Sequence, residues 1–244
     1  MTGSAARVPP HHLLVGAGQL LADAAANLMS PPAQYSVFQA AGEGVASWWY
    51  PAPRPARATL LFHTALGVTA HEHRLARRLA GAGCSCLLVR FAGRTSGQVL
   101  ESPAARERLH AIAGGALDHL HNAYPGHSAV VMALGLSLGG YLASWLGAFR
   151  PGVRGLAIWY GAYPQAEEWL RRGSVSTLII QGLRDSPVFV DTARRLAAAI
   201  PPGSVRLLPG ALHQFDLLQP HSAATAEAWA TTTAFLTSIK PRTV

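Results

Sequence analysis

The sequence AVVMALGLSLGGYL, residues 129–142, joins an apolar run to a helical pattern through a serine flanked by glycines. Such a run is typical of a buried strand. Gly135, Gly139 and Gly140 omit Cβ atoms that would collide with the backbone in a sharp strand-to-helix turn. The stretch therefore predicts a nucleophile elbow with Ser137 at its apex. An ordinary glycine-rich turn is the alternative, because short Gly-x-Ser-x-Gly matches also arise by chance.

Short apolar runs alternate with helical patterns from residue 58 onward. The expected strands are Thr59–His63, Ser85–Arg90, Ala129–Leu136, Gly155–Tyr160, Thr177–Gln181 and Val205–Leu208. The expected helices are His71–Ala82, Pro103–Ala123, Gly139–Phe149, Gln165–Arg171, Val188–Ala199 and Ser222–Ile239. This alternation indicates βαβ units and a mostly parallel central sheet with helices on both faces. Two earlier strands, Tyr35–Gln39 and Val45–Tyr50, have a hairpin pattern and would add an antiparallel edge.

The length and composition favour one domain with a short extension. The chain has 244 residues, 50% of them hydrophobic, which is enough for one substantial core. We expect an N-terminal extension at residues 1–34 and an α/β domain at residues 35–244. The apolar stretch Leu13–Met29 is interrupted by glycine and polar residues, so a cleaved signal peptide and a membrane span are not expected. A cytoplasmic location is the default.

The charge and the histidines indicate neither a nucleic-acid binder nor a metalloenzyme. Lys and Arg number 20 against 12 Asp and Glu, but the basic residues are scattered rather than clustered. His71 with His73, and His119 with His121, stand at i and i+2 on expected helices. Such pairs do not converge on a metal, so we expect solvated helix faces. Gly16-Ala17-Gly18 lacks the third glycine of a dinucleotide fingerprint, and no cofactor or metal is implied.

Two partners for Ser137 follow in the chain order that an elbow fold requires. Asp185 lies in the loop at the carboxyl end of the strand Thr177–Gln181, and His213 follows the final strand. His213 would act as the general base, while Asp185 would orient it and stabilise its charged form. Helix N-capping is the alternative role for Asp185. Asp191 and Asp216 are weaker candidates for the acid. Asp191 lies inside an expected helix, and Asp216 comes after the histidine in the chain.

The oxyanion hole is expected to consist of backbone N–H groups. Leu138 begins the helix behind the serine, so its N–H is the first expected donor. The second should come from the loop after the first parallel strand, where Ala65 is preferred and Leu66 comes next. Gly67 would let that loop turn close to the elbow, although a structural turn glycine is equally permitted.

From Thr59 to its C-terminus the chain resembles the dienelactone hydrolase family of α/β-hydrolases. The likeness rests on residues 66–68, the elbow at 135–140, Trp159-Tyr160-Gly161, residues 182–185 and the segment PGALHQFD at 209–216. The resemblance implies the α/β-hydrolase fold and cofactor-free hydrolysis of a lactone or related ester through an acyl-enzyme.

Three positions depart from the founding enzymes of that family. Ser137 stands where those enzymes have a cysteine, Thr64 where they have a glutamate, and Leu217 where they have one of two substrate-binding arginines. Arg94 aligns with the other arginine, and Tyr160 with an active-site tyrosine. The resemblance therefore implies substrate contacts from Arg94 and Tyr160, and we add Leu66 beside the oxyanion loop.

Together these features predict a carboxylic ester hydrolase that cleaves a small-molecule ester, lactone or thioester through an acyl-serine. The short segment between Tyr160 and Thr177 leaves no room for a large lid. One alternative is a pathway-specific thioesterase or cyclase, in which an internal hydroxyl or amine replaces water. Another is a non-hydrolytic or ligand-binding member of the fold. Nucleic-acid and membrane partners are not expected, and self-association as a homodimer is left open.

Overall fold

The computed structural model describes residues 32–53, 57–91, 97–173, 175–201 and 203–240. Its centre is an eight-stranded sheet with the order β1-β2-β4-β3-β5-β6-β7-β8. The strands are β1 Gln34–Ala40, β2 Glu43–Tyr50, β3 Ala58–Phe62, β4 Ser85–Val89, β5 Val131–Leu136, β6 Val153–Trp159, β7 Ser176–Gly182 and β8 Val205–Leu208. The six strands from β4 to β8 along the sheet are parallel. This is the expected α/β-hydrolase architecture.

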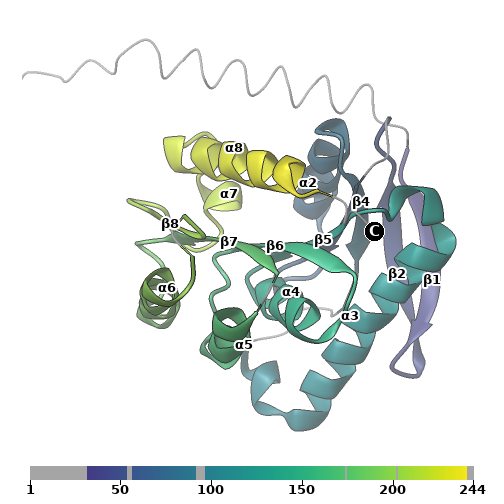
Figure 1. The fold of residues 1–244 in the computed structure, drawn as a ribbon, viewed down its shortest axis with the longest axis horizontal. Helices are drawn as coiled ribbons and strands as arrows, with labels where there is room; N and C mark the ends of the chain where they lie inside the picture. Colours follow the sequence, from purple (N-terminus) through teal and green to yellow (C-terminus); the bar gives the residue numbers. More distant parts are fainter. Residues whose placement is uncertain (1–31, 54–56, 92–96, 174, 202, 241–244) are drawn as a thin grey trace, which may run out of the picture.

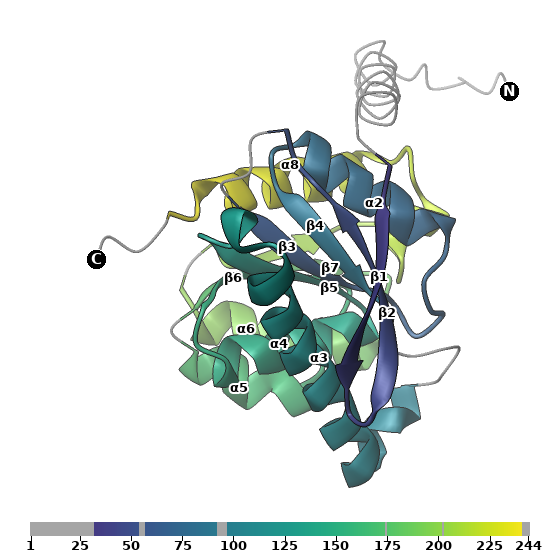
Figure 2. The same cartoon turned by 90° about the vertical axis from the view of Figure 1, so that its right-hand side faces the viewer.

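The first two strands form the expected antiparallel edge (Figure 2). Ala41 and Gly42 turn the chain between them with φ of 52° and 77°. Two positive φ values in succession match the twist of a tight hairpin. β2 then pairs antiparallel with β4, so the hairpin extends the parallel sheet at one side.

Helices cover both faces of the sheet (Figure 1). The α-helices are α2 Ala70–Gly81, α3 Pro103–Ala123, α4 Leu138–Phe149, α5 Glu167–Arg172, α6 Pro187–Ala199, α7 Phe215–Leu218 and α8 Ala223–Ser238. Short 3-10 segments are η1 Gly97–Glu101, η2 Pro125–His127 and η3 Pro164–Ala166. In Figure 1, α2, α7 and α8 lie on one side of the sheet and α3 to α6 on the other.

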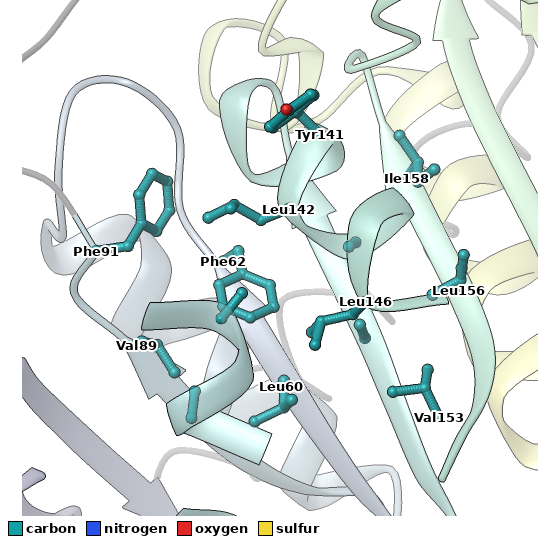
Figure 3. Packing of buried hydrophobic residues seen from close by; sticks show 14 of the residues in the cluster. Leu60, Phe62, Val89, Phe91, Tyr141, Leu142, Leu146, Val153, Leu156 and Ile158 are labelled. Carbon is teal, nitrogen blue, oxygen red and sulfur yellow. The ribbon is translucent and has the colours of Figure 1, made fainter. Parts of the chain in front are cut away.

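Each face of the sheet has its own apolar cluster. One joins the sheet to α3, α4, α5 and α6, and the other joins it to α2, α7 and α8. Figure 3 shows Leu142 and Leu146 of α4 pointing toward Leu60 and Phe62 of β3. Burying each such side chain contributes about 1.5–3 kcal/mol. The helix that begins at the elbow is therefore packed firmly against the strands that surround it.

The structure confirms the predicted strands and the main helices, with shifts of one or two residues at several ends. The helix α4 begins at Leu138, one residue earlier than expected, and the short helix α7 was not predicted. The expectation of solvated histidines is wrong for His71, which is buried against Asp216. His119 is half-buried and contacts Ser36. Within the described ranges, no helix has both the length and the apolar composition that crossing a bilayer requires.

Candidate active site

Ser137 lies at a strained turn between β5 and α4. Its φ of 50° and ψ of −117° lie outside the regions that a side-chain-bearing residue normally occupies. The glycines explain how the turn fits. A Cβ on Gly135 would lie 2.2 Å from the carbonyl oxygen of Gly139, and one on Gly140 would lie 2.9 Å from that of Gly161. The sequence therefore folds into the predicted elbow because these positions lack side chains.

The structure brings Ser137, His213 and Asp185 together in a hydrogen-bonded chain. Ser137 Oγ lies 3.0 Å from His213 Nε2, and His213 Nδ1 lies 2.8 Å from Asp185 Oδ2. With the proton on Nδ1, the imidazole donates to the carboxylate and Nε2 accepts from the serine hydroxyl. The three side chains come from the segments after β5, β7 and β8, which end at one edge of the sheet. Parallel pairing therefore assembles them.

The carboxylate of Asp185 is held from two further directions. The Gln181 side chain donates from Nε2 to Asp185 Oδ2 at 2.6 Å, and the Ser186 backbone N–H donates to Oδ1 at 2.5 Å. The Asp185 side chain is only 2% exposed, whereas that of His213 is 32% exposed. Hydrogen bonds to a buried carboxylate are worth about 1.5–3 kcal/mol each, so Asp185 is fixed for its imidazole partner.

Aromatic rings hold the His213 imidazole on two sides. Phe189 of α6 is stacked on it, with ring centroids 5.5 Å apart and planes 18° from parallel. Tyr160 meets the imidazole at 65°, with centroids 5.1 Å apart. These contacts and the bond to Asp185 leave the imidazole little freedom to rotate.

Tyr163 approaches the nucleophile from the loop after β6. Its ring packs against Phe189 with centroids 5.0 Å apart, and the residue is buried. Burial raises the pKa of Tyr163, and an interaction of its hydroxyl with the Ser137 side chain lowers the pKa by a smaller amount. The phenol therefore stays protonated beside the serine and is able to donate a hydrogen bond.

In the loop after β3, the Ala65 backbone N–H is free, whereas the Leu66 N–H is hydrogen-bonded within the part of the chain that the structure describes. The Leu66 N–H donates to Thr64 Oγ1 at 3.2 Å, and Gly67 N–H to the Thr64 carbonyl at 3.2 Å. Gly67 has a φ of 89°, so this turn needs a glycine. The Leu66 N–H therefore already has an acceptor. The Ala65 N–H makes no hydrogen bond in the part of the chain that the structure describes. The same holds for the Leu138 N–H at the start of α4.

His63 supports this loop from beneath. Its ring is fully buried and stacked on Phe91 with centroids 3.9 Å apart. Nδ1 lies 2.5 Å from the Thr64 carbonyl oxygen, and Nε2 accepts from the Phe91 N–H at 3.3 Å. Burial lowers the pKa of His63 to about 4. The neutral ring therefore links β3 to the segment after β4.

Comparison with known proteins gives this geometry a context. The profile of the dienelactone hydrolase family matches residues 46–240. The chain belongs to this family. A search among curated proteins gives no match.

Several solved structures share the fold of this family member. A dienelactone hydrolase from Anabaena variabilis is 22% identical, with a TM-score of 0.68 over 86% of this chain and 99% of that one. A dienelactone hydrolase-like promiscuous phosphotriesterase from metagenomic libraries is 20% identical, with a TM-score of 0.68 over 85% and 98% of the two chains. A cold-adapted esterase from an Arctic intertidal metagenomic library is 13% identical, with a TM-score of 0.65 over 87% and 98%. The family supports a hydrolase, and these neighbours show the same fold.

The expected substrate contacts have different outcomes. Leu66, in the loop after β3, is 48% exposed and remains a candidate contact. Arg94 lies outside the described residues. Tyr160 is fully buried behind His213, so we do not propose a substrate contact for it. Leu217, which replaces a family arginine, is 40% exposed. Among the described residues, no three potential metal-ligating side chains gather at one place.

Three residues at the site were missed by the sequence interpretation. Gln181 is a polar residue in the buried end of β7, four positions before Asp185, a signal that could have suggested a partner. Phe189 and Tyr163 gave no comparable signal, since aromatic residues near strand ends are common in cores. Their role depends on how α6 and the loop after β6 meet at His213.

Proposed function

We propose that this protein is a serine hydrolase that cleaves an ester, lactone or thioester through an acyl-serine intermediate. The observation that carries the proposal is the unbroken chain from Ser137 Oγ through His213 to Asp185, with the serine on a strained elbow. A buried serine with φ of 50° is costly, and strain of this kind concentrates at functional sites. Membership in a hydrolase family supports the same chemistry.

Acylation begins with a proton transfer inside this chain of bonds. Ser137 Oγ attacks the substrate carbonyl carbon while His213 Nε2 takes its proton. Asp185 stabilises the imidazolium, and the carbonyl oxygen becomes an oxyanion that accepts from the Leu138 and Ala65 N–H groups. His213 then donates its proton to the leaving oxygen or sulfur as that bond breaks. An acyl-serine and a free alcohol or thiol result.

Deacylation repeats these steps with water as the nucleophile. His213 removes a proton from water, the hydroxide attacks the acyl carbon, and the same N–H groups stabilise the second oxyanion. The proton returns to Ser137 Oγ as the ester bond breaks, and the acid is released. If an internal hydroxyl or amine reached the acyl-serine before water, the same residues would perform cyclisation. Product analysis distinguishes the two.

We further propose that residues 35–244 form the catalytic domain and that residues 1–34 are an extension to it. The proposed substrate is a small molecule, because the segment from η3 to α5 is too short to form a lid domain over the serine. Arg94 remains a proposed anion contact on the strength of the family resemblance. The proposed location is the cytoplasm, and nucleic acids, membranes and cofactors have no proposed role.

Steady-state hydrolysis of p-nitrophenyl acetate, with a panel of lactones and thioesters, tests this function. Ser137→Ala and His213→Ala should each lower kcat by about 10⁴-fold or more, because triad members act as a unit. His221→Ala is the matched control, since His221 is exposed and outside the site. It should retain wild-type turnover. Absence of turnover by the wild type on every substrate class would favour the ligand-binding or non-hydrolytic alternative.

A further inference from the structure

A second histidine–aspartate pair lies behind the triad and has no part in the steps above. His71 Nε2 lies 2.8 Å from Asp216 Oδ2, and the two side chains are 8% and 1% exposed. His71 stands in the first turn of α2, which is fixed by a capping box between Thr69 and Glu72. Asp216 stands in the first turn of α7, three residues after His213. The pair therefore ties the histidine loop to a helix on the face of the sheet.

Tyr160 lies near the same carboxylate. Its hydroxyl and Asp216 Oδ1 are both buried with no hydrogen-bond partner among the described residues. Burial raises the pKa of Tyr160 well above its usual range, and the nearby Asp216 carboxylate raises it further, with Glu72 and Asp185 adding smaller effects. The phenol is therefore a neutral donor facing an unsatisfied carboxylate oxygen.

The residues around Asp216 reach His213 through ring packing rather than through charge. The Tyr160 ring packs against His213, and it meets Phe215 at 90° with centroids 5.2 Å apart. Gln214, which lies between His213 and Phe215 in the chain, adopts a left-handed conformation with φ of 55°. A non-glycine residue at such a φ is maintained only when the surroundings hold it. The contacts on either side of Gln214 are Tyr160 packing and the His71–Asp216 pair.

We propose that Asp216, which is hydrogen-bonded to His71 and lies near Tyr160, is a positioning residue that keeps His213 within reach of Ser137. The inference rests on the proposed function, because it assigns Asp216 a role in that reaction. A buried pair could instead anchor α2 to α7 and affect stability alone. The two roles differ in their kinetic consequence. Loss of positioning lowers the rate at which Ser137 reacts in protein that remains folded, whereas loss of anchoring lowers only the melting temperature.

Two substitutions of Asp216 separate shape from hydrogen bonding. Asp216→Asn keeps an oxygen that accepts from His71 and offers an N–H₂ to the Tyr160 hydroxyl. Asp216→Leu has a similar size and accepts nothing. Asp191→Leu is the matched control, because Asp191 is an exposed aspartate on α6 whose ion pair with Arg194 lies at the surface.

The experiment measures the rate of Ser137 labelling by a small fluorophosphonate, together with kcat and KM for p-nitrophenyl acetate. Each variant is assayed at least 15 °C below its melting temperature. We expect Asp216→Leu to lower both the labelling rate and kcat by about 10- to 100-fold with little change in KM, as a displaced catalytic group does. Asp216→Asn should stay within about threefold of wild type, and Asp191→Leu should equal it.

Wild-type labelling in folded Asp216→Leu would overturn the inference while leaving the proposed function intact. An equal loss in Asp216→Asn and Asp216→Leu would overturn it as well, since the hydrogen bond would then not matter. Should Asp216→Leu fail to fold, His71→Leu applies the same test from the other partner, with the same expected loss. No labelling of the wild type would instead refute the proposed function.

Discussion

Replacing Gly139 by alanine tests the packing of the elbow against the oxyanion loop. A Cβ at this position would lie 2.3 Å from the Phe62 carbonyl oxygen and 2.8 Å from that of His63. Ordinary contacts begin at 3.4 Å, and both atoms belong to the backbone, so no side chain can rotate away. The strand and the elbow must separate by about 1 Å, which moves Ala65 relative to Ser137.

This displacement sets the size of the expected loss. A misplacement of about 1 Å at reacting groups costs about 100-fold in rate, and overpacking a core costs about 1–3 kcal/mol in the free energy of unfolding. We expect kcat for p-nitrophenyl acetate to fall by about 100-fold in Gly139→Ala, with urea unfolding showing the destabilisation. Gly126→Ala is the control, because a Cβ there meets nothing within 4 Å. Gly139→Ala with wild-type kcat and stability would refute this packing.

Three further changes test individual contacts. Gln181→Met removes a hydrogen bond to the Asp185 carboxylate and should lower kcat by about 10- to 100-fold, with KM unchanged in steady-state assays. Tyr163→Phe should slow fluorophosphonate labelling, whereas Tyr141→Phe, whose hydroxyl faces His110 at 2.9 Å, should not; equal rates would remove Tyr163 from the site. His63 is neutral in the folded protein until about pH 4, while the unfolded chain takes up the proton near pH 6.5. Its contribution to stability is therefore complete above pH 6.5 and falls by about 3 kcal/mol as the pH drops to 4. Denaturant titrations should show a weaker loss over this range in His63→Gln than in the wild type, and parallel curves would contradict the assignment.

The sequence was sufficient for the parts of the fold that depend on local patterns. Continuous apolar runs identified the buried strands, and parallel pairing then places every strand's carboxyl end at one edge. For that reason Ser137, Asp185 and His213 could be chosen from their positions after three strands. Gly67 could be expected at a tight turn but not shown to need a positive φ.

Contacts between distant segments could not be predicted in this way. The i and i+2 spacing of His71 and His73 gives no information about Asp216, which is 145 residues away from His71. His71 is buried where it binds Asp216 of α7, and the four-residue helix α7 is too short to leave a periodic signal. The aromatic contact between Phe189 and His213 depends likewise on where α6 begins relative to the last strand.

Intact-mass analysis after treatment with a small fluorophosphonate is the most direct test of an acyl-serine mechanism. Attack by Ser137 Oγ on phosphorus would expel fluoride and leave one phosphonyl group on the protein. The account predicts a single adduct on the wild type that peptide mapping assigns to Ser137, no adduct on Ser137→Ala, and much slower labelling of His213→Ala. An unlabelled wild type, or an adduct that persists in Ser137→Ala, would contradict the assignment of Ser137 as the nucleophile.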